Sequence, residues 1–141
     1  NALTFDALKK GKITIFGGKQ IRPNLTMDDM IKAYIFSLER KLKKNKPINE
    51  IIYNVGFENL SIINIAKRVN KIIKNKSDVI IKKSNDPRSY RQNSERILKA
   101  GFKPDKSIDD AIKQIEDKFI EKKLKLNKKF FRINTLKMIK K

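Results

Sequence analysis

Apolar residues recur along the chain at two spacings, which together predict alternating strands and helices. Short runs rich in branched apolar residues indicate strands at residues 13–16, 51–55 and 78–82. The run 51–55 is apolar almost throughout, which is typical of a strand buried on both faces of a parallel sheet. Residues 20–26 form a further extended segment, although Pro23 limits it to an edge or irregular strand.

Five other segments have helical spacing and residues suited to begin a helix. Residues 2–10 form a short helical pattern, and a longer one begins near Asp28, whose carboxylate suits the positive N-terminal end of a helix. Ser61, Asn93 and Ser107 are placed to cap the next three helices. The order of elements predicts an α/β fold with a small mixed sheet and flanking helices.

The composition of the chain changes near its end. The last 21 residues, from Glu121, hold nine basic residues and one acid. We therefore expect one domain over residues 1–120, followed by a basic extension of residues 121–141. The extension is either helical or frayed.

The length and composition exclude several classes of protein and site. With 141 residues the chain fits one domain that can bury a core. Cysteine and histidine are both absent, so disulfides, thiolate or imidazole metal ligands and a cysteine nucleophile are excluded. No apolar run approaches the roughly 20 residues that span a bilayer, and no signal peptide is recognisable. We expect a cytoplasmic protein without a metal. Because the first residue is Asn1, the chain can also be a piece of a longer one.

A net charge of +20 has two explanations. The first is a nucleic-acid partner. The second is compositional drift, because 28 of the 35 basic residues are lysine, and Lys, Ile and Asn together make up 63 residues. All three amino acids have A/T-rich codons, whereas nucleic-acid recognition usually favours arginine. We favour drift, and the nucleic-acid partner remains an alternative.

Arg22 and Arg88 stand out as arginines in a chain whose basic residues are mostly lysine. Each lies beside turn-forming residues, where ligand-contacting groups concentrate. A guanidinium group binds phosphate oxygens through two parallel hydrogen bonds, so two of them converging from separate loops would neutralise a pyrophosphate. The alternative is that each arginine pairs with a nearby carboxylate or faces solvent.

Three segments carry a resemblance to a known family. Residues 13–29 run from a strand through a glycine turn and an arginine into a helix, and residues 51–66 combine Tyr-Asn-Val-Gly with a serine-capped helix. Residues 86–115 contain an arginine, a small helix, Gly-Phe-Lys-Pro and a last helix. In this order they resemble the C-terminal, substrate-binding half of NAD-dependent epimerases/dehydratases, which are extended short-chain dehydrogenases/reductases. The resemblance covers about residues 1–120.

The resemblance implies a pocket for a nucleoside-diphosphate sugar. Arg22 and Arg88 lie where family members place arginines on the diphosphate. Ile13, Thr14 and Phe16 match the strand that lies along the nucleotide base, with main-chain groups and the aromatic ring as contacts.

Four further positions have implied roles or depart from the family pattern. Asn1 falls near an asparagine that reaches the diphosphate or sugar. Thr26 replaces a customary histidine, so any hydrogen bond of that residue is remade or lost. Asp29 is expected to have a structural role, fixing the helix start beside Arg22. Arg91 replaces an acidic residue, which alters how ribose is held or adds a third positive charge.

The family's catalytic and cofactor motifs are absent from these residues. There is no Gly-x-x-Gly-x-x-Gly turn for a dinucleotide and no Tyr-x-x-x-Lys pair for acid/base catalysis. The chain alone is therefore expected to bind no cofactor and to be non-catalytic, whereas the parent enzyme would bind NAD(P) through an N-terminal half supplied in cis or in trans. The alternatives are a basic nucleic-acid-binding α/β module and a non-catalytic assembly half.

Overall fold

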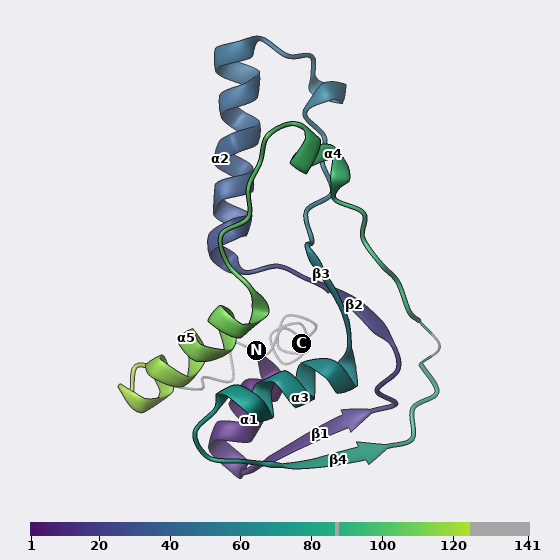
Figure 1. Ribbon diagram of the computed structural model, residues 1–141, viewed down its shortest axis with the longest axis vertical. Helices are drawn as coiled ribbons and strands as arrows, with labels where there is room; N and C mark the ends of the chain where they lie inside the picture. Colours follow the sequence, from purple (N-terminus) through teal and green to yellow (C-terminus); the bar gives the residue numbers. More distant parts are fainter. Residues whose placement is uncertain (87, 125–141) are drawn as a thin grey trace, which may run out of the picture.

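Helices and strands alternate along the chain in the computed structural model, which describes residues 1–86 and 88–124 (Figure 1). Within these residues the α-helices are α1 (Ala2–Lys10), α2 (Met27–Lys44), α3 (Ile62–Ile72), α4 (Glu95–Lys99) and α5 (Ile108–Ile120). The strands are β1 (Lys12–Phe16), β2 (Ile21–Asn24), β3 (Glu58–Ser61) and β4 (Asp78–Lys82), and a 3-10 turn covers Ile48–Glu50. The predicted α/β fold class is confirmed.

The strands pair in both orientations, but in two separate sheets. Strands β1 and β4 are parallel, with Lys12 opposite Asp78 and Phe16 opposite Lys82. Strands β2 and β3 are antiparallel. Each sheet has two strands, so the parallel and antiparallel pairs do not share the single mixed sheet that the sequence suggested.

The main core lies where β1 meets the helices. Ile13 and Ile15 alternate with exposed or half-buried residues along β1 and are fully buried. They pack in one cluster with Ala7 of α1, Val69 of α3 and Ile112 of α5. The period of two along β1 therefore gives the strand one buried face, which these helices cover.

A second core joins α2 to α4 and the segment after it. Ala33 of α2, Ile97 of α4 and Phe102 are buried together. The Phe102 ring stacks on Phe57 at 5.7 Å and meets Phe36 edge to face at 5.5 Å. Figure 1 shows α2 and α4 at one end of the molecule and the β1–β4 pair at the other.

The predicted strand at residues 51–55 is wrong. This segment is irregular, with Tyr53 and Val55 packed against the second core and Ile52 exposed. The strand forms later, at β3, where the backbone pairs with β2. An apolar run shows only that side chains are available for burial, and here it fills a core without forming a ladder.

The N-terminus of α2 is held by two side chains. Thr26 caps the helix, and its Oγ1 accepts a hydrogen bond from the Asp29 amide at 3.2 Å. Asp29 is fully buried, and its carboxylate accepts hydrogen bonds from the amides of Asp105 (2.9 Å) and Lys106 (3.0 Å). The carboxylate of Asp29 thus joins α2 to the segment that precedes α5. The expected structural role lies in this link more than in the helix start.

Helix α5 begins with a reciprocal cap between Ser107 and Asp110 and ends at Ile120. The predicted boundary before residue 121 stays a prediction, because residues 125–141 of the basic extension lie outside the described part of the chain. No helix among the described residues is long and apolar enough to cross a membrane.

The link made by Asp29 predicts a loss of stability in Asp29→Asn. The substitution removes a charged acceptor from the amides of Asp105 and Lys106, so the free energy of unfolding should fall by about 1.5–3 kcal/mol. Asp28→Asn is the matched control, because Asp28 is exposed one residue earlier on the same helix. Urea denaturation, monitored by circular dichroism, measures the free energy of unfolding of both variants. Equal losses would contradict the assigned role of Asp29.

Candidate functional site

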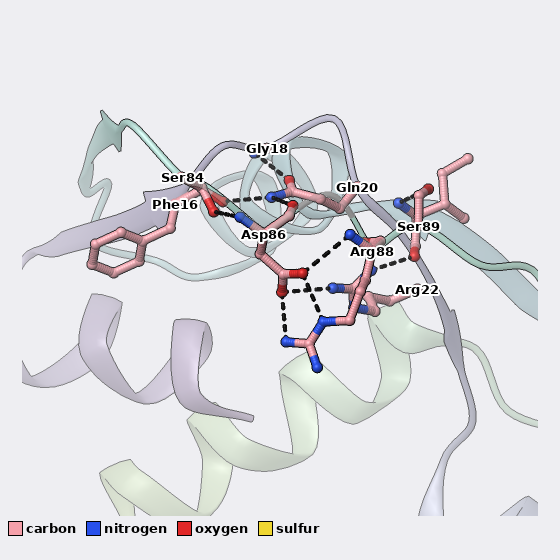
Figure 2. Close-up of polar contacts among 9 residues, drawn as sticks. Phe16, Gly18, Gln20, Arg22, Ser84, Asp86, Arg88 and Ser89 are labelled. Carbon is pink, nitrogen blue, oxygen red and sulfur yellow. Dashed lines mark hydrogen bonds and ion pairs between the residues drawn. The ribbon is translucent and has the colours of Figure 1, made fainter.

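The candidate site lies beyond the C-terminal ends of the parallel strands. The segments that follow β1 and β4 meet there, and they carry Arg22 and Arg88 (Figure 2). Gly17, directly after β1, donates its amide to the carbonyl of Lys82, the last residue of β4, at 2.9 Å. In open α/β sheets, ligands bind outside the carboxyl ends of parallel strands. The fold therefore brings the two predicted arginines to a position typical of ligand sites.

Asp86 lies between the two arginines. Its Oδ1 accepts a hydrogen bond from Nε of Arg88 at 2.7 Å, and its Oδ2 accepts one from Nη2 of Arg88 at 2.8 Å. Nη2 of Arg22 is 3.6 Å from the same Oδ2. One carboxylate thus holds both guanidinium groups, and the cluster keeps one more positive than negative charge.

The two arginines differ in how firmly they are held. Nη1 of Arg22 donates to the carbonyls of Ile21 (2.9 Å) and Arg88 (2.7 Å), and its guanidinium lies 4.8 Å from the centre of the Tyr90 ring. The Arg22 side chain is 24% exposed, compared with 76% for Arg88. The Arg22 side chain is therefore held in place by its neighbours, whereas the Arg88 side chain is largely exposed at the surface of the site.

Polar side chains tie the two loops together behind the arginines. Gln20 accepts a hydrogen bond from the Gly18 amide at 2.7 Å and donates to the carbonyls of Phe16 (3.1 Å) and Asp86 (3.5 Å). Ser89 accepts one from the Ile21 amide at 2.9 Å. The Gln20–Asp86 and Ser89–Ile21 contacts join chain segments that are 66 and 68 residues apart, as Figure 2 shows, and they fix the spacing of the arginines.

The glycine turn after β1 does not suit a dinucleotide cofactor. Gly17 has a φ of 77°, and a side chain there would overlap the amide group of Gln20. The Gly18 amide is already bonded to that side chain, and the turn leads into β2, not into the N-terminus of a helix. Dinucleotide sites place the pyrophosphate at a helix N-terminus. We therefore assign no step to NAD(P) in this chain.

The environment of Asp86 and Arg88 shifts both pKa values. Hydrogen bonds from the side chain and backbone of Arg88 lower the pKa of Asp86 to about 2. The same carboxylate raises the pKa of Arg88. Asp86 and Arg88 are thus both charged at neutral pH.

The other residues predicted to bind substrate do not all lie at the arginine cluster. A cavity of about 320 Å³ is lined by Asn1, Thr4, Arg22, Thr26 and Asp29 among others. Arg22 therefore belongs both to the arginine cluster and to this cavity, whereas Arg88 does not line the cavity.

The residues predicted along the nucleotide base share β1 but differ in exposure. Ile13 is fully buried in the core, main chain included, so it offers no accessible surface to a ligand in this structure. Thr14 is half-buried, and Phe16 is 58% exposed at the strand end, with its ring directed away from the two arginines (Figure 2). Arg91 is exposed and lines a different hollow with Asn59 and Gln92, apart from the cavity of Arg22.

Sequence reasoning did not single out three members of the site, Asp86, Gln20 and Ser89. It allowed for a nearby carboxylate as the partner of an arginine without naming one. Asp86 had a local signal, because it lies two residues before Arg88 in a turn. Gln20 and Ser89 had no signal for the contacts that join the two loops, since Asp86 and Ile21 are distant from them in sequence.

Comparison with known proteins identifies a related fold. No family model matches the chain, and no curated protein matches it. A solved structure with a similar fold is CJ1428, a GDP-D-glycero-L-gluco-heptose synthase from Campylobacter jejuni, determined in the presence of NADPH. The TM-score is 0.59 and the identity 21%, over 82% of this chain and 35% of that chain. This chain thus spans about a third of the synthase and shares its fold over that part.

The contacts of Asp86 predict its titration. Its carboxyl carbon, followed by NMR, should titrate near pH 2, and Arg88→Ala should move the pKa towards the ordinary 3.8. Arg22→Ala should move it less, because Arg88 is the main cause of the shift. A lowered folded-state pKa means that the ion pair stabilises the fold above the ordinary pKa and is lost as the pH falls towards 2. An ordinary pKa in the unsubstituted chain would contradict the cluster.

Proposed function

We propose that this chain is the substrate-binding portion of an NAD(P)-dependent enzyme that acts on a nucleoside-diphosphate sugar, with Arg22 and Arg88 on the diphosphate. The observation that carries the proposal is the meeting of both guanidinium groups at one carboxylate beyond the ends of the parallel strands. The fold shared with part of a GDP-heptose synthase supports it.

The geometry of Asp86 explains why a diphosphate suits the site. Its carboxylate is an oxyanion held by two guanidinium groups, so the cluster has the spacing and charge to hold phosphate oxygens. Asp86 occupies the Nε–Nη2 edge of Arg88 and leaves the other edge of the guanidinium for a ligand. The exposed Arg88 arm can close over a phosphate, while the anchored Arg22 presents the second charge.

The rest of the substrate is assigned to neighbouring surfaces. The nucleotide base lies along β1, with the Phe16 ring and Thr14 as contacts. Ile13 is fully buried and packs in the core beneath that strand. The sugar extends from Arg22 into the cavity of about 320 Å³ near Asn1.

The chemistry of the reaction is assigned to another part of the enzyme. The printed sequence has no Tyr-x-x-x-Lys pair, because Tyr34, Tyr53 and Tyr90 are each followed four residues later by a residue other than lysine. The chain also spans about a third of the related synthase. In this proposal the N-terminal half, in the same or a separate polypeptide, holds NAD(P) and supplies the catalytic residues.

Substitution of the two arginines by lysine tests the proposal. Arg22→Lys and Arg88→Lys keep the charge but remove the planar fork, so each should weaken binding of a UDP- or GDP-sugar by about tenfold or more. Arg96→Lys is the control, because Arg96 lies on α4 and donates to the carbonyl of Asn49. Isothermal titration calorimetry measures the affinities. Equal affinities for the unsubstituted chain and the double variant would contradict a role of these arginines in binding diphosphate.

Substitution of Asp86 tests whether its carboxylate competes with the ligand. In Asp86→Asn both guanidinium groups lose their internal anion, and affinity for UDP should rise about two- to fivefold, the range of exposed ion pairs. Asp105→Asn is the control, because Asp105 pairs with Lys32 at the surface. The same titration gives the result. A fall in affinity in Asp86→Asn alone would show that the carboxylate does not compete.

A further inference from the structure

Helix α2 carries apolar side chains on two opposite sides. On its inner side, Ala33 and Phe36 pack against Ile97 and Phe102 in the second core. This contact attaches the helix to the rest of the described chain. A helix that needed no other partner would be polar on its remaining surface.

The opposite side of α2 is also apolar, and we name it the outer stripe. Its residues recur at intervals of three and four along the whole helix, which places them on one side. Their exposed fractions range from 39% to 79%. The outer stripe consists of Met27, Met30, Ile31, Tyr34, Ile35, Leu38 and Leu42.

The apolar surface continues from the outer stripe onto the segment after α2. A cavity of about 420 Å³ lies between Met30 and Tyr34 of the stripe and residues 51–53 and 55. Ile52, which lines this cavity, and Ile48, four residues before it, are each more than 60% exposed. The outer stripe and the adjacent cavity together form an apolar surface against which a second structural element can pack.

Such a surface is unusual for an isolated soluble domain. Contiguous exposed apolar patches rarely exceed a few hundred Å² on monomers, and larger ones mark contacts with a partner. A helix that is apolar on both sides is typical of a helix buried between two layers. The outer stripe therefore requires a covering partner.

We propose that the outer stripe of α2 is the docking surface for the α/β unit that completes the larger enzyme, in the same or a separate polypeptide. The inference rests on that part of the proposed function which makes this chain one portion of such an enzyme. About two thirds of the related synthase has no counterpart in this chain.

The charge and composition of α2 argue against two other partners for the outer stripe, a second copy of the chain and a nucleic acid. A second copy of the chain would bring two bodies of net charge +20 together, and each α2 ends in Lys41, Lys43 and Lys44. A nucleic acid needs cationic groups and aromatic rings along its path, whereas the outer stripe is mainly aliphatic. An apolar surface with acidic residues at its rim would complement both the stripe and these lysines.

Site-specific photocrosslinking tests the docking surface in the full chain. The photoreactive residue p-benzoylphenylalanine is placed at Tyr34 on the stripe and, as a control, at the exposed Lys67 of α3. The protein is made in its cells of origin, and crosslinked peptides are identified by mass spectrometry. We expect an adduct at Tyr34, and none at Lys67, with a polypeptide segment that contains a Gly-x-x-Gly-x-x-Gly turn.

A double variant, Ile31→Asp with Leu38→Asp, should reduce the Tyr34 adduct at least tenfold. Both side chains are more than half exposed, so circular dichroism of the chain should be unchanged. An adduct with a second copy, a lipid, a nucleic acid or a polypeptide without the glycine turn would overturn the proposal, as would no adduct. Titration with sugar nucleotides tests Arg22 and Arg88, whereas crosslinking tests the outer stripe. A failure of the proposed function is therefore distinguishable from a failure of the docking proposal.

Discussion

The carboxylate of Asp86 is the interaction on which the candidate site depends. It bonds Arg88 through two parallel hydrogen bonds and lies 3.6 Å from Arg22, so two cations from distant segments are held together. Without a shared anion, two guanidinium groups at this spacing would repel each other. The arrangement resembles an anion site with an internal anion bound. The proposed diphosphate would take over the role that Asp86 has in this structure.

The scaffold supports that cluster from two directions. The parallel pair β1–β4 sets the starting points of both loops, and Gln20 and Ser89 then join the loops by hydrogen bonds. Asp29 links α2 to the segment before α5 through two hydrogen bonds, and it lines the same cavity as Arg22. The same scaffold leaves the outer stripe of α2 uncovered, which is understandable if a further unit packs on it.

Much of the fold was predictable from the sequence because its signals are local. Strands β1 and β4 follow from runs of branched apolar residues, and the starts of α3 and α5 follow from Ser61 and Ser107 as caps. The strand predicted at residues 51–55 is wrong, because apolar side chains indicate burial but do not determine whether the backbone pairs in a sheet. The arginines were found by residue type, but their shared carboxylate and the Gln20 contacts depend on residues about 65 positions apart. Such contacts have no local pattern.

The most direct test of the account is an NMR titration of the arginine side chains. In a chain labelled with ¹⁵N-arginine, the Nε–H signals of Arg22 and Arg88 are followed as UDP is added, with Arg40 and Arg68 as internal references. The account predicts that Arg22 and Arg88 shift together with one saturation curve while the references stay in place. Uniform small shifts of all arginines, or no shift at Arg22 and Arg88, would contradict it.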